Sequence, residues 1–416
     1  MKKTLLSAAI FWTTAFQLSL AQSAVTLVAT DVDNFWQAYD KIVTTRDTLA
    51  QLAYLQRLFL NKATPGQLAM IKARSYTEKD YLEAINQRQE YFMSIRQNTL
   101  RTNDYSKAIE TKVASLKKLY PSLKPAEIYY TVGAFRSGGT TVANMVLIGS
   151  EIAMAEAHLD NLVFTNIHEY VHTQQKSTTC DNLLGQSVME GVAEFVAEKA
   201  TETKSTLSAL GYGRQNIDKI KQLFAKQMFN IDYGFWLYSD AENLFGTRDL
   251  GYYVGYAIAE SYYHKAKDKR KAIKELIEVD ANNPQALAKY VDKSGYFDKP
   301  VTSLMDEYEK GRPVVLSVDP LKNGQLVSPQ VSRFTINFSA PMNKHSRNFE
   351  LGPLGMDYLI KVKTFIGFSA DGKSAAFELE KLEPNRHYQL LIGQGFRDLN
   401  GIRIKPYLMD FKTGNL

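Results

Sequence analysis

The chain has 416 residues, which is long enough for two or three domains with substantial hydrophobic cores. Its formal net charge of +6 is mild for this length and argues against a dedicated nucleic-acid-binding protein. Cys180 is the only cysteine, so no intrachain disulfide can form, and we expect its thiol to be structural.

The N-terminus, residues 1–21, is expected to be a secretory signal peptide. Two lysines precede an apolar run from residue 4 to residue 20, and Ser19-Leu20-Ala21 favours cleavage after Ala21. A membrane anchor is the competing interpretation, but the run is short and contains Ser, Thr and Gln. No other stretch is long and apolar enough to span a bilayer. We therefore expect an exported protein, periplasmic or secreted, with no transmembrane anchor after cleavage.

A polar-rich helical region is predicted from residue 32 to residue 123. Two short strands follow at residues 126–133 and 145–149, separated by a turn over residues 136–141. Helical patterns then continue to residue 308. We expect residues 25–310 to form one domain, with residues 126–310 as its core.

The sequence His168-Glu169-Tyr170-Val171-His172 has the HExxH spacing of a zinc hydrolase. Residues four apart lie on one face of a helix, so His168 and His172 can bind one metal ion. A carboxylate next to the first ligand can take a proton from a metal-activated water, which makes Glu169 the candidate general base.

A second helical pattern, over residues 187–198, places Glu190 and Glu194 on one face beside an apolar stripe. Carboxylates this close to a packed face are costly unless they are paired or bind a metal. We predict that Glu190 is the third zinc ligand, and that Glu194 orients a ligand histidine through its outer ring nitrogen. The alternative is that both glutamates are solvated, with Ser187 and Glu190 forming a capping box.

HExxH followed by a helix bearing ExxxE resembles the gluzincin, or thermolysin-like, zinc metallopeptidases. More narrowly, residues 167–172, 189–195 and 251–256 resemble a family of predicted zinc-dependent proteases of exported bacterial proteins, over roughly residues 30 to 310. The resemblance implies one Zn²⁺ per chain at His168, His172 and Glu190, with Glu169 as general base. It also implies that an edge strand before the HExxH helix pairs with extended substrate, a position that residues 145–149 fit.

A tyrosine-rich helical pattern over residues 249–263 could supply a donor to the oxyanion that peptide hydrolysis develops. Tyr256 is the first candidate and Tyr253 the second, and Tyr252 shares a face with Tyr256. Tyrosines at helical spacing are, as an alternative, common in core packing.

Short alternating strands and the turn signals Asp371-Gly372 and Asn400-Gly401 predict a β-sandwich over residues 313–416. Residues 338–342 and 397–413 resemble a bacterial Ig-like domain. His345 and His387 lack partners at ligand spacing and are expected at the surface.

The expected fold class is α+β, with a mainly helical gluzincin-type catalytic domain containing a small β-sheet, followed by an all-β Ig-like sandwich. The expected activity is zinc-dependent hydrolysis of peptide or protein substrates, and the Ig-like domain could contact a surface or a partner. Two alternatives stay open. One is hydrolysis of a non-peptide amide such as a cell-wall crosslink, and the other is a non-catalytic surface-binding protein with a relic zinc site.

Overall fold

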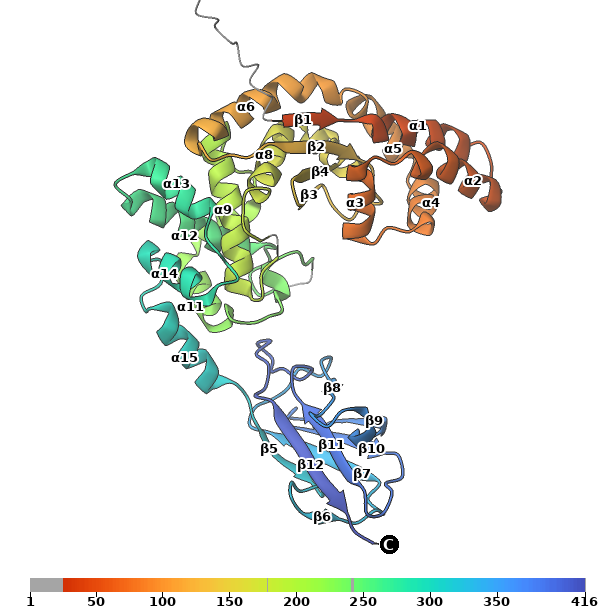
Figure 1. The fold of residues 1–416 in the computed structure, drawn as a ribbon, viewed down its shortest axis with the longest axis vertical. Coiled ribbons are helices and arrows are strands. Elements are labelled where there is room, and N and C mark those ends of the chain that lie inside the picture. The colour runs from red at the N-terminus through yellow and green to blue at the C-terminus, as the bar shows by residue number, and fades with distance from the viewer. Residues whose placement is uncertain (1–24, 178, 241–242, 416) are drawn as a thin grey trace, which may run out of the picture.

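The computed structural model describes residues 25–177, 179–240 and 243–415 (Figure 1). The expected signal peptide lies outside these residues. Two separate hydrophobic cores divide the described chain, one formed between Val25 and Leu304 and the other between Val315 and Phe411. The fold is therefore α+β, with a helical first part and an all-β second part.

Six helices between residues 30 and 119 form the N-terminal region and agree with its predicted helical character. They are α1 (Thr30–Ile42), α2 (Thr48–Leu58), α3 (Pro65–Arg74), α4 (Glu78–Gln87), α5 (Gln89–Thr99) and α6 (Ser106–Leu119). Polar residues cap several of them; for example, Thr77 and Asp80 form a capping box at the start of α4.

A small four-stranded sheet packs among these helices, in the order β1-β2-β4-β3. Its strands are β1 (Val25–Val28), β2 (Ala126–Thr131), β3 (Gly139–Val142) and β4 (Met145–Gly149). The first three in that order run parallel, whereas β3 is antiparallel to β4 and forms the edge opposite β1.

The edge strand of this sheet differs from the one expected from the sequence. Residues 139–141 belong to β3 rather than to a turn, and β4 lies inside the sheet, so that β3 takes the edge position expected for residues 145–149. Gly139–Val142 is short and rich in threonine, so it lacks the apolar alternation that marks a strand in sequence.

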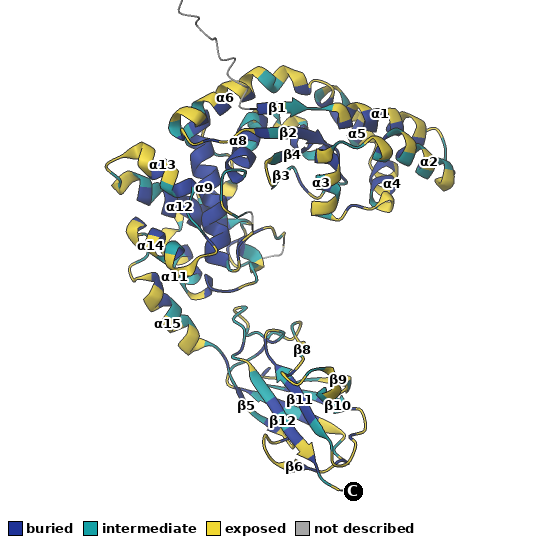
Figure 2. Cartoon of the chain, in the orientation of Figure 1, coloured by how far each residue is buried: buried dark blue, intermediate teal, exposed yellow. Residues whose placement is uncertain are grey.

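Nine further α-helices lie among the described residues of the first part of the chain. They are α7 (Ser150–Ala153), α8 (Leu162–His172), α9 (Leu183–Thr201), α10 (Ser208–Gln215), α11 (Ile217–Gln227), α12 (Leu250–Lys265), α13 (Lys269–Ile277), α14 (Pro284–Ser294) and α15 (Val301–Gly311). Figure 2 shows α9 as an almost fully buried helix at the centre of this part.

Helices α9 and α12 are in backbone contact. A Cβ atom at Gly191 would lie 2.0 Å from the backbone nitrogen of Tyr256, and one at Gly255 would lie 1.7 Å from the carbonyl oxygen of Ser187. Only glycine permits this approach, which fixes how the two helices are rotated against one another.

The second part is a sandwich of two four-stranded sheets, ordered β5-β7-β10-β9 and β6-β12-β11-β8. The strands are β5 (Val315–Asp319), β6 (Leu326–Val327), β7 (Arg333–Phe338), β8 (Phe349–Glu350), β9 (Val362–Phe368), β10 (Ser374–Leu379), β11 (His387–Ile392) and β12 (Tyr407–Thr413). Alternate residues of β7 (Phe334, Ile336 and Phe338) face the core, as the sequence pattern predicts. In the described part of the chain, no helix has the length and apolar character that a membrane crossing requires.

Candidate metal centre

Helices α8 and α9 bring His168, His172 and Glu190 together. The Nε2 atoms of the two histidines are 3.1 Å apart. Glu190 Oε2 lies 3.2 Å from Nε2 of His172 and 3.5 Å from Nε2 of His168. All three residues are buried. Among the described residues, this is the one group of three or more His, Cys, Asp or Glu side chains with donor atoms close enough to hold a metal ion.

The electrostatics of this group follow from burying opposite charges together. Burial by itself lowers the pKa of both histidines, but the facing carboxylates outweigh it, so that the pKa of His168 lies well above its ordinary value and that of His172 is also raised. Burial by itself raises the pKa of Glu190, but the two histidines hold it well below the usual range. Glu190 is therefore an anionic oxygen donor facing two ring nitrogens.

The outer nitrogen of each ring also faces an oxygen. Glu194 Oε2 lies 2.8 Å from Nδ1 of His168. Gln175 Oε1 lies 2.7 Å from Nδ1 of His172, and the amide of Gln175 donates to the Met189 carbonyl on α9. The structure thus places the Glu194 carboxylate next to the outer nitrogen of His168. Gln175 was missed, because it follows the end of α8 and no helical spacing links it to His172.

Glu169 lies on the same helix and is held by β3. Thr141 Oγ1 donates to the Glu169 carboxylate at 2.9 Å and to its backbone oxygen at 2.8 Å. A Cβ atom at Gly139 would come within 2.7 Å of Glu169 Oε1. The edge strand therefore fixes the carboxylate from one side, and Thr141 is a further residue that sequence reasoning missed.

The two tyrosines chosen from the sequence point elsewhere. The hydroxyl of Tyr256 donates to Glu198 at 3.0 Å, and the ring of Tyr253 packs over Gly213 of α10. Tyr252 borders the cluster instead, since its ring stacks on that of His168 with centroids 6.2 Å apart. Burial, and next the Glu190 carboxylate, raises the pKa of Tyr252 well above its ordinary value, so its hydroxyl stays protonated and able to donate.

Tyr238 is a second tyrosine at the cluster. Its hydroxyl donates to Glu190 Oε1 and accepts from the Gln186 amide at 2.7 Å. Tyr238 lies between helices, where no periodic pattern pointed to it.

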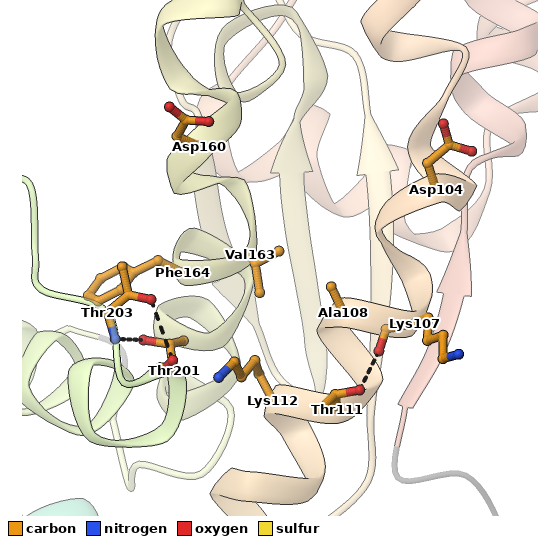
Figure 3. Close-up of a pocket in the computed structure, with 10 residues that line it drawn as sticks. All are labelled: Asp104, Lys107, Ala108, Thr111, Lys112, Asp160, Val163, Phe164, Thr201 and Thr203. Atoms are coloured by element: carbon orange, nitrogen blue, oxygen red, sulfur yellow. Dashed lines mark hydrogen bonds between the residues drawn. The ribbon is translucent and has the colours of Figure 1, made fainter.

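An open surface cavity of about 590 Å³ lies apart from this centre (Figure 3). It is lined by Asp104, Lys107, Ala108, Thr111, Lys112, Asp160, Val163, Phe164, Thr201 and Thr203. None of the cluster residues lines it, and its lysines are surface residues, so it adds nothing to the candidate centre.

Comparisons with known proteins bear on the C-terminal part. Residues 309–413 match the family model of the bacterial Ig-like domain. This match supports the Ig-like domain expected at the C-terminus. No curated protein matches the chain.

Among solved structures, the S-layer protein rSbsC(31-844) is 13% identical with a TM-score of 0.20, and the match covers 93% of this chain and 45% of that one. The N-terminal part of the bacterial S-layer protein SbsC is 14% identical with the same TM-score, and the match covers 93% of this chain and 78% of that one. The chain thus spans less than half of rSbsC(31-844). Scores this low carry no argument about fold or function.

None of the described residues of the Ig-like domain belongs to the metal-ligand group. Nε2 of His387 lies 2.7 Å from an oxygen of Asp410 on the neighbouring strand, an ordinary cross-strand pair. His345 lies in the exposed turn after Met342. The candidate metal ligands of the described chain therefore all lie in the helical part.

Proposed function

We propose that the protein is an exported zinc metallopeptidase of gluzincin type. The observation that carries the proposal is the convergence of two imidazole nitrogens and one carboxylate oxygen, from His168, His172 and Glu190, beside Glu169. Two histidines and one glutamate are one of the donor sets that hold zinc in catalytic sites. The described residues offer no fourth protein ligand in this group, which suits a catalytic site with an open position better than a closed structural one.

Zn²⁺, when bound, supplies a Lewis acid for the scissile carbonyl and lowers the pKa of water. The chain's own residues carry the proton and the geometry. Glu169, oriented by Thr141, accepts a proton from the attacking water and passes it to the leaving amine. Tyr252 donates its hydroxyl to the oxygen on which negative charge develops, the role first expected for Tyr256 or Tyr253.

Residues around the ligands hold the histidine rings in place. The Glu194 carboxylate lies 2.8 Å from Nδ1 of His168, and Gln175 accepts from the Nδ1–H group of His172. Both contacts favour the tautomer that presents Nε2 to the ion. A buried base oriented by a neighbouring hydroxyl has no use in a purely structural zinc site, so the contact between Glu169 and Thr141 favours hydrolysis over metal storage.

Elemental analysis of the purified mature protein tests this function. We expect about one zinc per chain, lost or greatly weakened in His168→Ala and Glu190→Ala. Glu169→Gln should keep its zinc and lose hydrolysis of a fluorogenic peptide library by roughly 10²- to 10⁴-fold. The matched control is Glu307→Gln, an exposed glutamate of α15, which should keep both.

Absence of zinc from the wild type, even after Zn²⁺ is supplied at neutral pH, would refute the metal centre. Full activity of Glu169→Gln would refute the assignment of the base. If the protein keeps its zinc and hydrolyses a cell-wall amide but no peptide, the mechanism stands and the substrate class is wrong.

A further inference from the structure

The segment of residues 228–238, called here the connecting segment, runs from the end of α11 to the metal centre. At its start it binds the first turn of α9, the helix that carries Glu190. Leu183 N–H donates to the Asn230 carbonyl and Leu184 N–H to the Met228 carbonyl, both at 2.8 Å. The first N–H groups of a helix have no partner within the helix, so the connecting segment fixes where α9 begins.

At its other end the connecting segment reaches the candidate ligand itself. Tyr233 donates to the Cys180 carbonyl at 2.6 Å and contacts Gln186 Oε1 at 3.2 Å. Gln186 in turn donates to Tyr238, and the Tyr238 hydroxyl donates to Glu190 Oε1. With Oε1 held in this way, the other oxygen of Glu190 is the one that faces the two histidines.

Tyr238 is held in an unusual backbone conformation. Its φ is 61°, a left-handed value that a tyrosine rarely adopts, and its backbone N–H donates to Asp249 at 2.8 Å. The residue as a whole is 50% exposed, although its hydroxyl donates to Glu190. Such a residue keeps its position only where the surrounding segment is firmly anchored.

The Ig-like domain supplies that anchor. Asp232, in the middle of the connecting segment, pairs with two arginines of the domain, with Arg397 at 2.6 Å and with Arg403 at 3.1 Å. The Asn230 amide also contacts the Asn400 carbonyl at 3.4 Å. One carboxylate shared by two partly buried guanidinium groups is stronger than an isolated surface ion pair.

The linker between the two parts is tied to the same place. Arg312, which directly follows α15, donates to the Ile404 carbonyl at 2.7 Å and to the Arg403 carbonyl at 3.1 Å. Tyr308 of α15 donates to Asn230 at 3.0 Å. The loop around Arg403, between β11 and β12, is thus joined both to the last helix and to the connecting segment.

We infer that the Ig-like domain stabilises the metal centre. It holds the connecting segment in place, so that Tyr238 orients Glu190 for metal binding. The inference rests on the proposed metal site. Asp232 and Tyr238 act as positioning residues, and neither touches the reacting atoms. The Ig-like domain would then affect metal binding by the other domain of the same chain.

The test measures zinc affinity of full-length variants by competition with a chromophoric chelator, a readout that needs no substrate. Tyr238→Phe should raise the zinc dissociation constant about 10-fold, the lower end of the effect of removing a group that orients a ligand. Asp232→Ala should raise it several-fold, and the double variant should bind no more weakly than Tyr238→Phe alone. The matched control is Asp40→Ala, which breaks a two-bond pair with Arg96 far from the junction and should leave the affinity unchanged.

Wild-type affinity in Asp232→Ala would overturn the inference while leaving the metal centre intact. Independent, multiplying effects of Asp232→Ala and Tyr238→Phe would also overturn it, because they would mean that Asp232 does not act through Tyr238. A wild type that binds no zinc overturns the proposed function itself. If Asp232→Ala does not fold, the double variant Arg397→Met/Arg403→Met removes both ion pairs of Asp232 from the Ig-like side and answers the same question.

Discussion

Glu151 is a fully buried carboxyl group whose ionisation should weaken the fold around the edge strand. It lies on α7 with 1% of its surface exposed. It accepts from the backbone N–H groups of Gly133 at 2.9 Å and Phe135 at 3.2 Å, in the loop that leads from β2 to β3. Burial raises its pKa to about 7, although the backbone donors oppose the shift.

The sign and size of the effect follow from that pKa. Below the ordinary glutamate pKa of 4.5, Glu151 is protonated in both the folded and the unfolded chain, so its ionisation does not change the free energy of unfolding. As the pH rises from there to about 7, the unfolded chain ionises while the folded chain keeps its proton, so the free energy of unfolding falls. Above about pH 7 the loss is complete and amounts to about 3 kcal/mol, at 1.36 kcal/mol for each pKa unit.

Glu151→Gln removes the ionisation and keeps a similar shape. Denaturant unfolding of wild type and variant, repeated from about pH 4.5 to about pH 8, should show the variant gaining about 3 kcal/mol relative to wild type across that range. Trp36 lines the same internal space as Glu151, so its fluorescence reports the relevant unfolding. Glu83→Gln, with an exposed side chain, is the control and should follow the wild type. Parallel pH profiles for wild type and Glu151→Gln would refute the reasoning.

Three further predictions concern the edge strand, the contact between α9 and α12, and the loop between α8 and α9. Gly139→Ala places a Cβ 2.7 Å from the Glu169 carboxylate, so it should lower the rate of hydrolysis about 10-fold or more while the zinc content stays nearly unchanged. The control is Gly138→Ala, whose Cβ would lie 3.2 Å from a side-chain carbon and should change neither the rate nor the zinc content. Gly191→Ala forces α9 and α12 apart and should lower the free energy of unfolding by about 3 kcal/mol or more, measured by denaturant titration. Cys180, with its pKa raised to about 12 by burial and then by Glu190, should react with a thiol reagent at pH 8 only after denaturation; rapid labelling of the native protein would contradict its burial.

The sequence by itself predicts the features that depend on the spacing of residues within one helix or one strand. His168 and His172 share a face because they are four apart on one helix, and Glu190 and Glu194 do so on the next. In the same way, alternation along β7 predicts a half-buried strand, and the family match agrees with the predicted Ig-like sandwich.

Contacts between elements were decided by the tertiary structure alone. Tyr252 and Tyr256 share a face of α12, so spacing cannot separate them. The close crossing at Gly191 and Gly255 sets the position of α12 along α9. Tyr256 lies one helical turn, about 5.4 Å, further along α12 than Tyr252, so its hydroxyl meets Glu198 and not the cluster.

Thr141, Gln175 and Tyr238 reach the centre from an edge strand, a helix end and an irregular segment. In such places no period relates a residue to its partner, because the partner lies on another element. Helical spacing determines which side chains share a surface, but only packing between elements determines what that surface meets.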